Sequence, residues 1–163
     1  MRTIISVLVE NRSGVLARTA GLFARRGFNI ESLAVGETED SSVSRMTIVV
    51  EGDERVIEQV SKQLNKQIDT IKVRELKVGA ATRRELALVK VHATPKTRGE
   101  IIDIATIMKA KIVDISATTL TVEISERPEK VKQMLLLLEP YGIAELARTG
   151  MVALQKGSGG IAE

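Results

Sequence analysis

The same order of strand and helix patterns occurs twice along this chain of 163 residues. In the first half, residues 3–9 alternate as a strand does, with Ile5, Val7 and Val9 on one side. The elements that follow are a helix over 14–26, strands over 29–36 and 43–50, a helix from Asp53 and a short strand from Ile71. This β-α-β-β-α-β order is that of a ferredoxin-like unit, so the pattern predicts an α+β fold.

The second half repeats the order after a stretch of small residues, 78–82. Its expected strands are 86–93, 112–116, 120–124, 143–147 and 151–154, and its expected helices are 97–110 and one that begins at Pro128. The expected division is a first domain over 1–77, a linker over 78–84, a second ferredoxin-like domain over 85–156 and a flexible tail over 157–163. Because each half is small for a self-sufficient core, we expect at least a homodimer.

The start of the first helix has features suited to a small zwitterionic ligand. Ser13 is the expected N-cap, and the missing Cβ of Gly14 lets a ligand approach the backbone, whose free N–H groups attract a carboxylate. Asn11 and Asn29 can donate to a carboxylate or accept from an ammonium group. Alternatively, Gly14 relaxes a tight turn and the asparagines satisfy local backbone groups. The residues alone leave both interpretations open.

Composition excludes several classes of function. The absence of cysteine excludes disulfides, thiolate chemistry and Cys-ligated zinc, and the single histidine, His92, has no second metal ligand beside it. Aromatic residues make up only 2%, and 24 basic and 21 acidic residues are mixed, so we expect no nucleic-acid partner. No apolar stretch is long enough to cross a bilayer or to form a signal peptide, which predicts a cytoplasmic protein without a membrane partner. No acid, base and nucleophile occur together, and we therefore expect no catalytic site.

Several blocks of the sequence match a known family. In the first half they are residues 4–11, 14–16, 21–23, 26–33, 44–47 and 58–60, and in the second half 84–91, 112–115 and 147–150. Over essentially its whole length the chain resembles the regulatory (small) subunit of acetolactate synthase, also called acetohydroxyacid synthase. Its first half resembles an ACT domain, the ferredoxin-like module that senses amino acids.

The resemblance implies a regulatory chain that binds a large, thiamine-diphosphate-dependent catalytic subunit and raises its activity. It also implies feedback inhibition by valine, and in some members by leucine or isoleucine. No cofactor is expected in this chain, whereas thiamine diphosphate, magnesium and FAD are expected in the catalytic subunit. Alternatives are a free-standing amino-acid sensor that acts on another protein, a regulator that binds nucleic acid, and a small enzyme.

The resemblance also implies an effector site between the ACT domains of a homodimer. Residues of one chain would face residues of the other: Asn11, Gly14, Val15 and Leu16 on one side, Asn29 and Ile30 on the other. Val15, Leu16, Ile30 and Val35 would surround the aliphatic side chain of the effector. Ala34 and Gly36 belong to the same expected site, where family members often carry a hydroxyl residue and an alanine. No metal ligand is expected.

Overall fold

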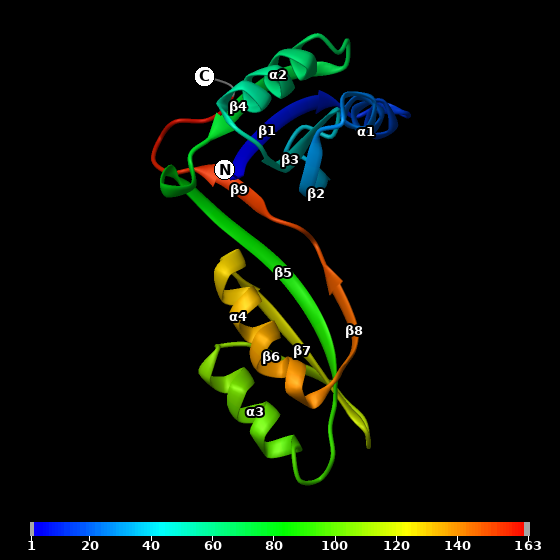
Figure 1. The fold of residues 1–163 in the computed structure, drawn as a ribbon, viewed down its shortest axis with the longest axis vertical. Coiled ribbons are helices and arrows are strands. Elements are labelled where there is room, and N and C mark those ends of the chain that lie inside the picture. The colour runs from blue at the N-terminus through cyan, green and yellow to red at the C-terminus, as the bar shows by residue number, and fades with distance from the viewer. Residues whose placement is uncertain (1, 162–163) are drawn as a thin grey trace. The chain divides into compact units, whose positions relative to one another are not determined.

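A computed structural model describes residues 2–161, which form two compact units (Figure 1). The first unit comprises the chain up to Thr82 together with the segment from Met151 onward. Its elements are β1 (Arg2–Glu10), α1 (Val15–Arg26), β2 (Asn29–Glu37), β3 (Val43–Glu51), α2 (Glu54–Asn65), β4 (Thr70–Leu76), a 3-10 turn (Val78–Ala80) and β9 (Val152–Gln155). The strand order is β2-β3-β1-β4, with all neighbours antiparallel.

The second unit, Arg83–Gly150, has the same architecture. Its elements are β5 (Ala81–His92), which begins in the first unit, α3 (Arg98–Ile107), β6 (Lys111–Ile115), β7 (Thr119–Glu126), α4 (Pro128–Leu138), a 3-10 turn (Glu139–Tyr141) and β8 (Ile143–Arg148). The strand order is β6-β7-β5-β8. Two β-α-β-β-α-β units in tandem confirm the predicted α+β fold.

Local signals mark the end of α1 and the start of α2, whereas the start of α1 has no capping side chain. Gly27 ends α1 in the left-handed conformation (φ 69°), and the Asp53 carboxylate caps α2 by accepting from the Val56 amide at 2.9 Å. The predicted N-cap at Ser13 is wrong, because the N-cap is Gly14, with φ 85° and no side-chain hydrogen bond to the first turn. The turn after β1 needs this positive φ, which glycine adopts without a steric penalty, and it leaves Ser13 outside the helix.

The core of the first unit lies between one face of its sheet and the two helices. Alternate residues of β1 and β3 point toward α1 and α2, as the period of a strand requires. The buried side chains of this core include Ile5, Val7, Val9, Met46, Ile48, Val50, Leu22, Phe23, Ile57, Val60 and Leu64. Helices α3 and α4 cover one face of the second sheet in the same way.

The C-terminal segment belongs to the first unit, which differs from the expected domain boundaries of 85–156 and 157–163. Ile4 and Leu76 are buried on the sheet face opposite the helices, and Ala153 of β9 packs in their cluster. Ile161 is 8% exposed, and the expected tail residues 162 and 163 lie outside the described residues. Because β1 has apolar residues on both faces, the face opposite the helices also has to be shielded from water. The segment expected as a linker, 78–84, instead contains a 3-10 turn and the first residues of β5.

Shortening a core side chain of α2 should destabilise the first unit strongly. Leu64→Ala removes a fully buried side chain, and we expect a loss of about 2–5 kcal/mol in the free energy of unfolding. Ile68→Ala is the control, because Ile68 is 87% exposed and its truncation should cost less than about 0.5 kcal/mol. Urea unfolding followed by circular dichroism measures both, and equal losses would contradict the assigned core.

Adding one methyl group at Gly14 should also destabilise the protein. Gly14→Ala places an L side chain at φ 85°, which costs about 1–2 kcal/mol, and its Cβ would lie 2.8 Å from Nη1 of Arg18. Gly36→Ala is the matched control, since nothing lies within 4 Å of its added Cβ, and alanine in a strand is favoured over glycine by about 0.5–1 kcal/mol. The two substitutions should therefore shift the urea midpoint in opposite directions.

Candidate functional site

The first turn of α1 presents open backbone donors. Arg18 donates its amide to the Gly14 carbonyl at 3.0 Å, and the Val15 amide makes a long contact of 3.4 Å with the Arg12 carbonyl. Within residues 2–161, the amides of Leu16 and Ala17 have no partner, and no acidic side chain lies in this turn. The positive end of the helix dipole is therefore left without a capping group from the chain, as an anion site requires.

Of the expected effector residues on α1, one side chain is exposed and one belongs to the core. Leu16 is 47% exposed beside the open amides, so its side chain can contact a ligand. Val15 is buried in the core between the sheet and the helices and is not on the outer surface of α1. Leu16 is therefore accessible at the surface of α1, whereas Val15 packs in the core.

Asn11 lies next to this turn, and its side chain already has partners. Its amide nitrogen Nδ2 donates to Oε1 of Glu37 at 3.1 Å and to the carbonyl of Ser41 at 2.9 Å. Its backbone amide donates to the Ser42 carbonyl at 2.8 Å. In a single chain Asn11 thus fastens the end of β1 to the turn between β2 and β3, which is the local interpretation left open by the sequence.

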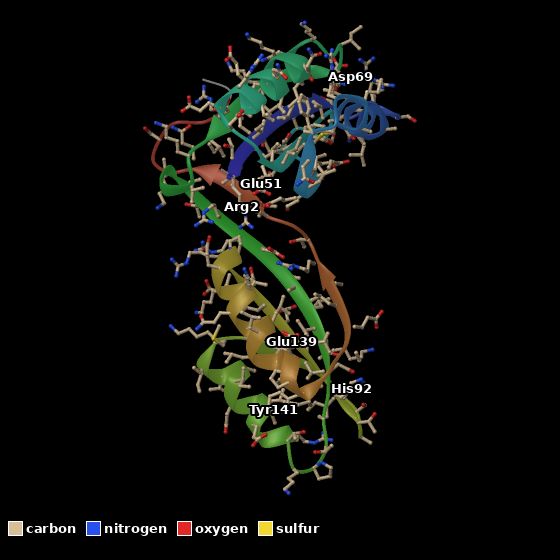
Figure 2. All side chains as sticks on the ribbon, in the orientation of Figure 1. Arg2, Glu51, Asp69, His92, Glu139 and Tyr141 are labelled. Atoms are coloured by element: carbon tan, nitrogen blue, oxygen red, sulfur yellow. The ribbon has the colours of Figure 1, made fainter. Side chains whose placement is uncertain are left out.

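Asn29 lies at the other end of the sheet. It is opposite Glu51 of β3, whereas Glu37 at the far end of β2 is opposite Ser44. Ser44 and Glu51 are seven residues apart on β3, which corresponds to about 24 Å at 3.4 Å per residue. Figure 2 shows Glu51 at one end of this sheet and Asp69, beside the start of α1, at the other. One chain therefore does not bring Asn29 and Ile30 together with Asn11 and Gly14.

The expected effector residues of β2 also divide between the two faces of the sheet. Ile30 and Val35 are paired with β3 residues whose side chains are in the helix-covered core, while Ala34 and Gly36 point to the opposite face. Their partners on β3 are, in that order, Val50, Met46, Thr47 and Arg45. Within one chain, a ligand on the helix side of β2 can reach the side chain of Val35 but not that of Ala34. The alternation of side chains along a strand separates these residues, although they were expected in one site.

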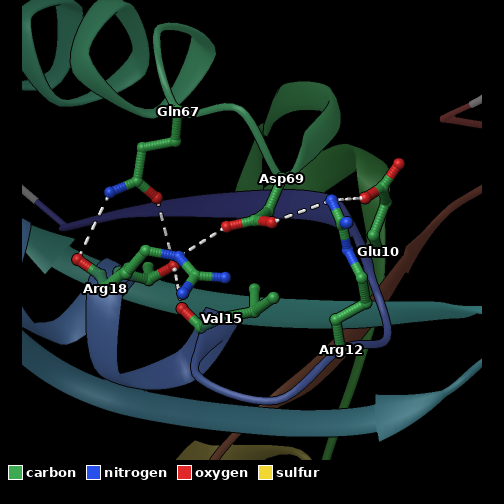
Figure 3. Close-up of polar contacts among 7 residues, drawn as sticks. Glu10, Arg12, Val15, Arg18, Gln67 and Asp69 are labelled. Carbon is green, nitrogen blue, oxygen red and sulfur yellow. Dashed lines mark hydrogen bonds and ion pairs between the residues drawn. The ribbon is translucent and has the colours of Figure 1, made fainter.

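A buried carboxylate that the sequence analysis missed stands beside the α1 turn. Asp69, in the loop between α2 and β4, is 3% exposed and accepts from Nε of Arg18 at 2.7 Å and from Nη2 of Arg12 at 3.3 Å (Figure 3). The hydrogen bond from Arg18 lowers the pKa of Asp69 below its ordinary value of 3.8, and the charges of both arginines add to this effect. Arg12 also pairs with Glu10.

Backbone and amide contacts fasten the same loop to β1 and α1. The Glu10 amide donates to the Asp69 carbonyl at 2.9 Å. Gln67 accepts from Oγ1 of Thr19 at 3.2 Å and donates to the Arg18 carbonyl at 3.3 Å. These partners are 48 to 59 residues apart in the sequence, so no local pattern reveals them.

The described residues 2–161 contain one histidine and many acidic side chains that could act as metal ligands. No group of three or more histidine, cysteine, aspartate or glutamate side chains is placed to hold a metal ion there. His92 is exposed at the end of β5, close to Gly142, in the neighbourhood shown in Figure 2. Among the described helices, none is both long and apolar enough to cross a membrane.

Comparisons with known proteins agree in both halves of the chain. The model of the AHAS small subunit-like ACT domain matches residues 5–72, and that of the small subunit of acetolactate synthase matches residues 84–157. The probable acetolactate synthase small subunit of Archaeoglobus fulgidus is 56% identical, covering 97% of this chain and 99% of that protein. The acetolactate synthase small subunit of Mycolicibacterium smegmatis is 52% identical over 96% of this chain and 92% of its own.

A solved structure extends the agreement to three dimensions. The crystal structure of the acetolactate synthase small subunit from Thermotoga maritima superposes with a TM-score of 0.91 at 38% sequence identity, covering 98% of this chain and 99% of that one. The family models, the relatives and the solved structure thus all match both units of this chain. The chain belongs to the acetolactate synthase small-subunit family, and its N-terminal half is an ACT domain.

Proposed function

We propose that this chain is a regulatory subunit that binds the large, catalytic subunit of acetolactate synthase, raises its activity and confers feedback inhibition by valine or another branched-chain amino acid. Membership of the small-subunit family supports the regulatory role and the partner. In this proposal the chain has no catalytic site and no cofactor of its own. Thiamine diphosphate, magnesium and FAD belong to the catalytic subunit.

The single observation that carries the effector proposal is the uncapped first turn of α1. Its free amides suit the carboxylate of an amino acid, and the neighbouring exposed side chain of Leu16 suits an aliphatic group.

We propose further that two copies of the ACT domain complete the site. Gly14 and Asn29 lie near opposite ends of the sheet, which are roughly 24 Å apart along β3. A ligand of amino-acid size cannot span that length, so contact with both residues requires two chains. Strand β2 is an edge strand, whose unpaired backbone groups favour association with a second copy. The dimer would then regulate by linkage: valine binds one arrangement of the holoenzyme better and shifts the population toward it, with a coupling on the order of 1–3 kcal/mol.

The test measures acetolactate formation by the catalytic subunit, with and without this chain, across a valine titration. Asn29→Ala should raise the valine concentration for half inhibition about 2-fold to 10-fold, the effect of losing one hydrogen bond of about 0.5–1.5 kcal/mol. The side chain of Asn29 is exposed and has no partner within residues 2–161, so thermal unfolding should not change.

Asn65→Ala is the matched control, because Asn65 is an exposed asparagine at the end of α2, outside the expected site. It should leave the valine response unchanged. If the chain leaves the catalytic rate unaltered, the proposed activation is wrong. If it activates but Asn29→Ala and Asn65→Ala respond alike to valine, the proposed contact across the dimer is wrong.

A further inference from the structure

Arg12, Arg18 and Asp69 form a network of ion pairs at the start of α1. This network holds the guanidinium of Arg18 in one orientation but leaves some of its hydrogen-bond donors without a partner within residues 2–161. We propose that Arg18 binds the carboxylate of the effector, a role that rests on the effector site proposed above and adds a residue to it. The ligand class is then defined by its free carboxylate as well as by its aliphatic side chain.

Arg18 lies directly over the turn that begins α1. Its Nη1 atom is 2.8 Å from the position that a Cβ on Gly14 would occupy. The side chain therefore folds back toward the N-terminal end of its own helix, where the unpartnered amides of Leu16 and Ala17 are found. The positive charge of the guanidinium and the positive end of the helix dipole converge on one place.

The contacts of Arg18 fix its orientation and leave its outer donors free. Nε bonds to Oδ2 of the buried Asp69 at 2.7 Å, and the Arg18 carbonyl accepts from Gln67 at 3.3 Å (Figure 3). Within residues 2–161 the terminal nitrogens Nη1 and Nη2 have no partner, and the side chain is 51% exposed. A guanidinium held by Nε presents the two terminal nitrogens to solvent, and these donors match a carboxylate.

Arg12 also bonds to Asp69, but its guanidinium is less suited than that of Arg18 to binding the carboxylate of the effector. Its Nη2 atom is bonded to Asp69 at 3.3 Å and is also paired with Glu10, so two carboxylates compensate its charge. Arg12 and Arg18 thus differ in the feature that matters for a ligand: Nη2 of Arg12 is engaged by two carboxylates, whereas both terminal nitrogens of Arg18 have no partner within residues 2–161. This difference makes Arg12 a matched control.

The experiment is calorimetric titration of the full chain with valine and with valinamide, which keeps the ammonium group and side chain but lacks the carboxylate. Arg18→Met should weaken valine binding about tenfold or more, because a charge-assisted hydrogen bond is lost. The affinity of Arg12→Met for valine should stay within about threefold of that of the parent chain.

Valinamide should bind the parent chain weakly. Arg18→Met should not weaken valinamide binding further, since the group that Arg18 contacts is absent from valinamide. Arg18→Lys keeps the charge without the fork and should recover part of the affinity for valine.

The outcomes separate this inference from the proposed function. If the parent binds valine and Arg18→Met binds it within about threefold, Arg18 is not a ligand and the effector site stands without it. If Arg18→Met and Arg12→Met weaken valine equally, or if Arg18→Met weakens valinamide as much as valine, the loss comes from disturbing the Asp69 contacts and the inference is wrong. If the parent binds no branched-chain amino acid, the effector site itself fails and the inference fails with it.

Discussion

The left-handed backbone at Gly14 is the constraint on which the proposed binding surface of the first unit depends. The two helices of this unit begin in contrasting ways. Asp53 caps α2 with its carboxylate, so the Val56 amide is satisfied from within the chain. Gly14 begins α1 with φ 85° and no capping side chain, so the corresponding amides stay open. The same supersecondary unit thus carries one closed and one open helix start, and only the open one suits an anionic ligand.

The contacts of Asp69 explain why this open turn keeps its shape. A turn without a capping side chain loses one of its ordinary supports, and here long-range contacts replace it. The buried carboxylate attaches the α2–β4 loop to α1 through Arg18, and its backbone carbonyl attaches the loop to β1 through the Glu10 amide. A carboxylate with so little access to water requires charged partners, and both arginines supply them. The lowered pKa of Asp69 keeps the carboxylate charged at lower pH than that of an ordinary aspartate.

Sequence periodicity predicted the fold well because each unit is built from elements with local signals. Alternation marked the strands, and Gly27, Asp53 and Pro128 stand at the helix ends where their chemistry places them. The N-cap at Ser13 was wrong because Ser13 and Gly14 are both reasonable caps, and only the path of the turn decides between them. The anchoring of Arg18 by Asp69 was out of reach, because it joins residues 51 positions apart. The residues expected for the effector site lie at two ends and on two faces of a sheet, a distribution that depends on strand pairing and not on local sequence.

The two units differ in the face of the sheet that the helices do not cover, and this difference affects the contacts of β2. In the second unit that face carries polar side chains such as Lys90, Thr121 and Glu145, which water can solvate. In the first unit the face buries Ile4 and Leu76, and the C-terminal segment covers it. The segment also reaches β2, because the Met151 amide donates to Oγ of Ser32 at 3.0 Å. Ser32 lies three residues after Asn29, the first residue of β2. The segment that covers the hydrophobic face thus also contacts the strand that is expected to bind the effector.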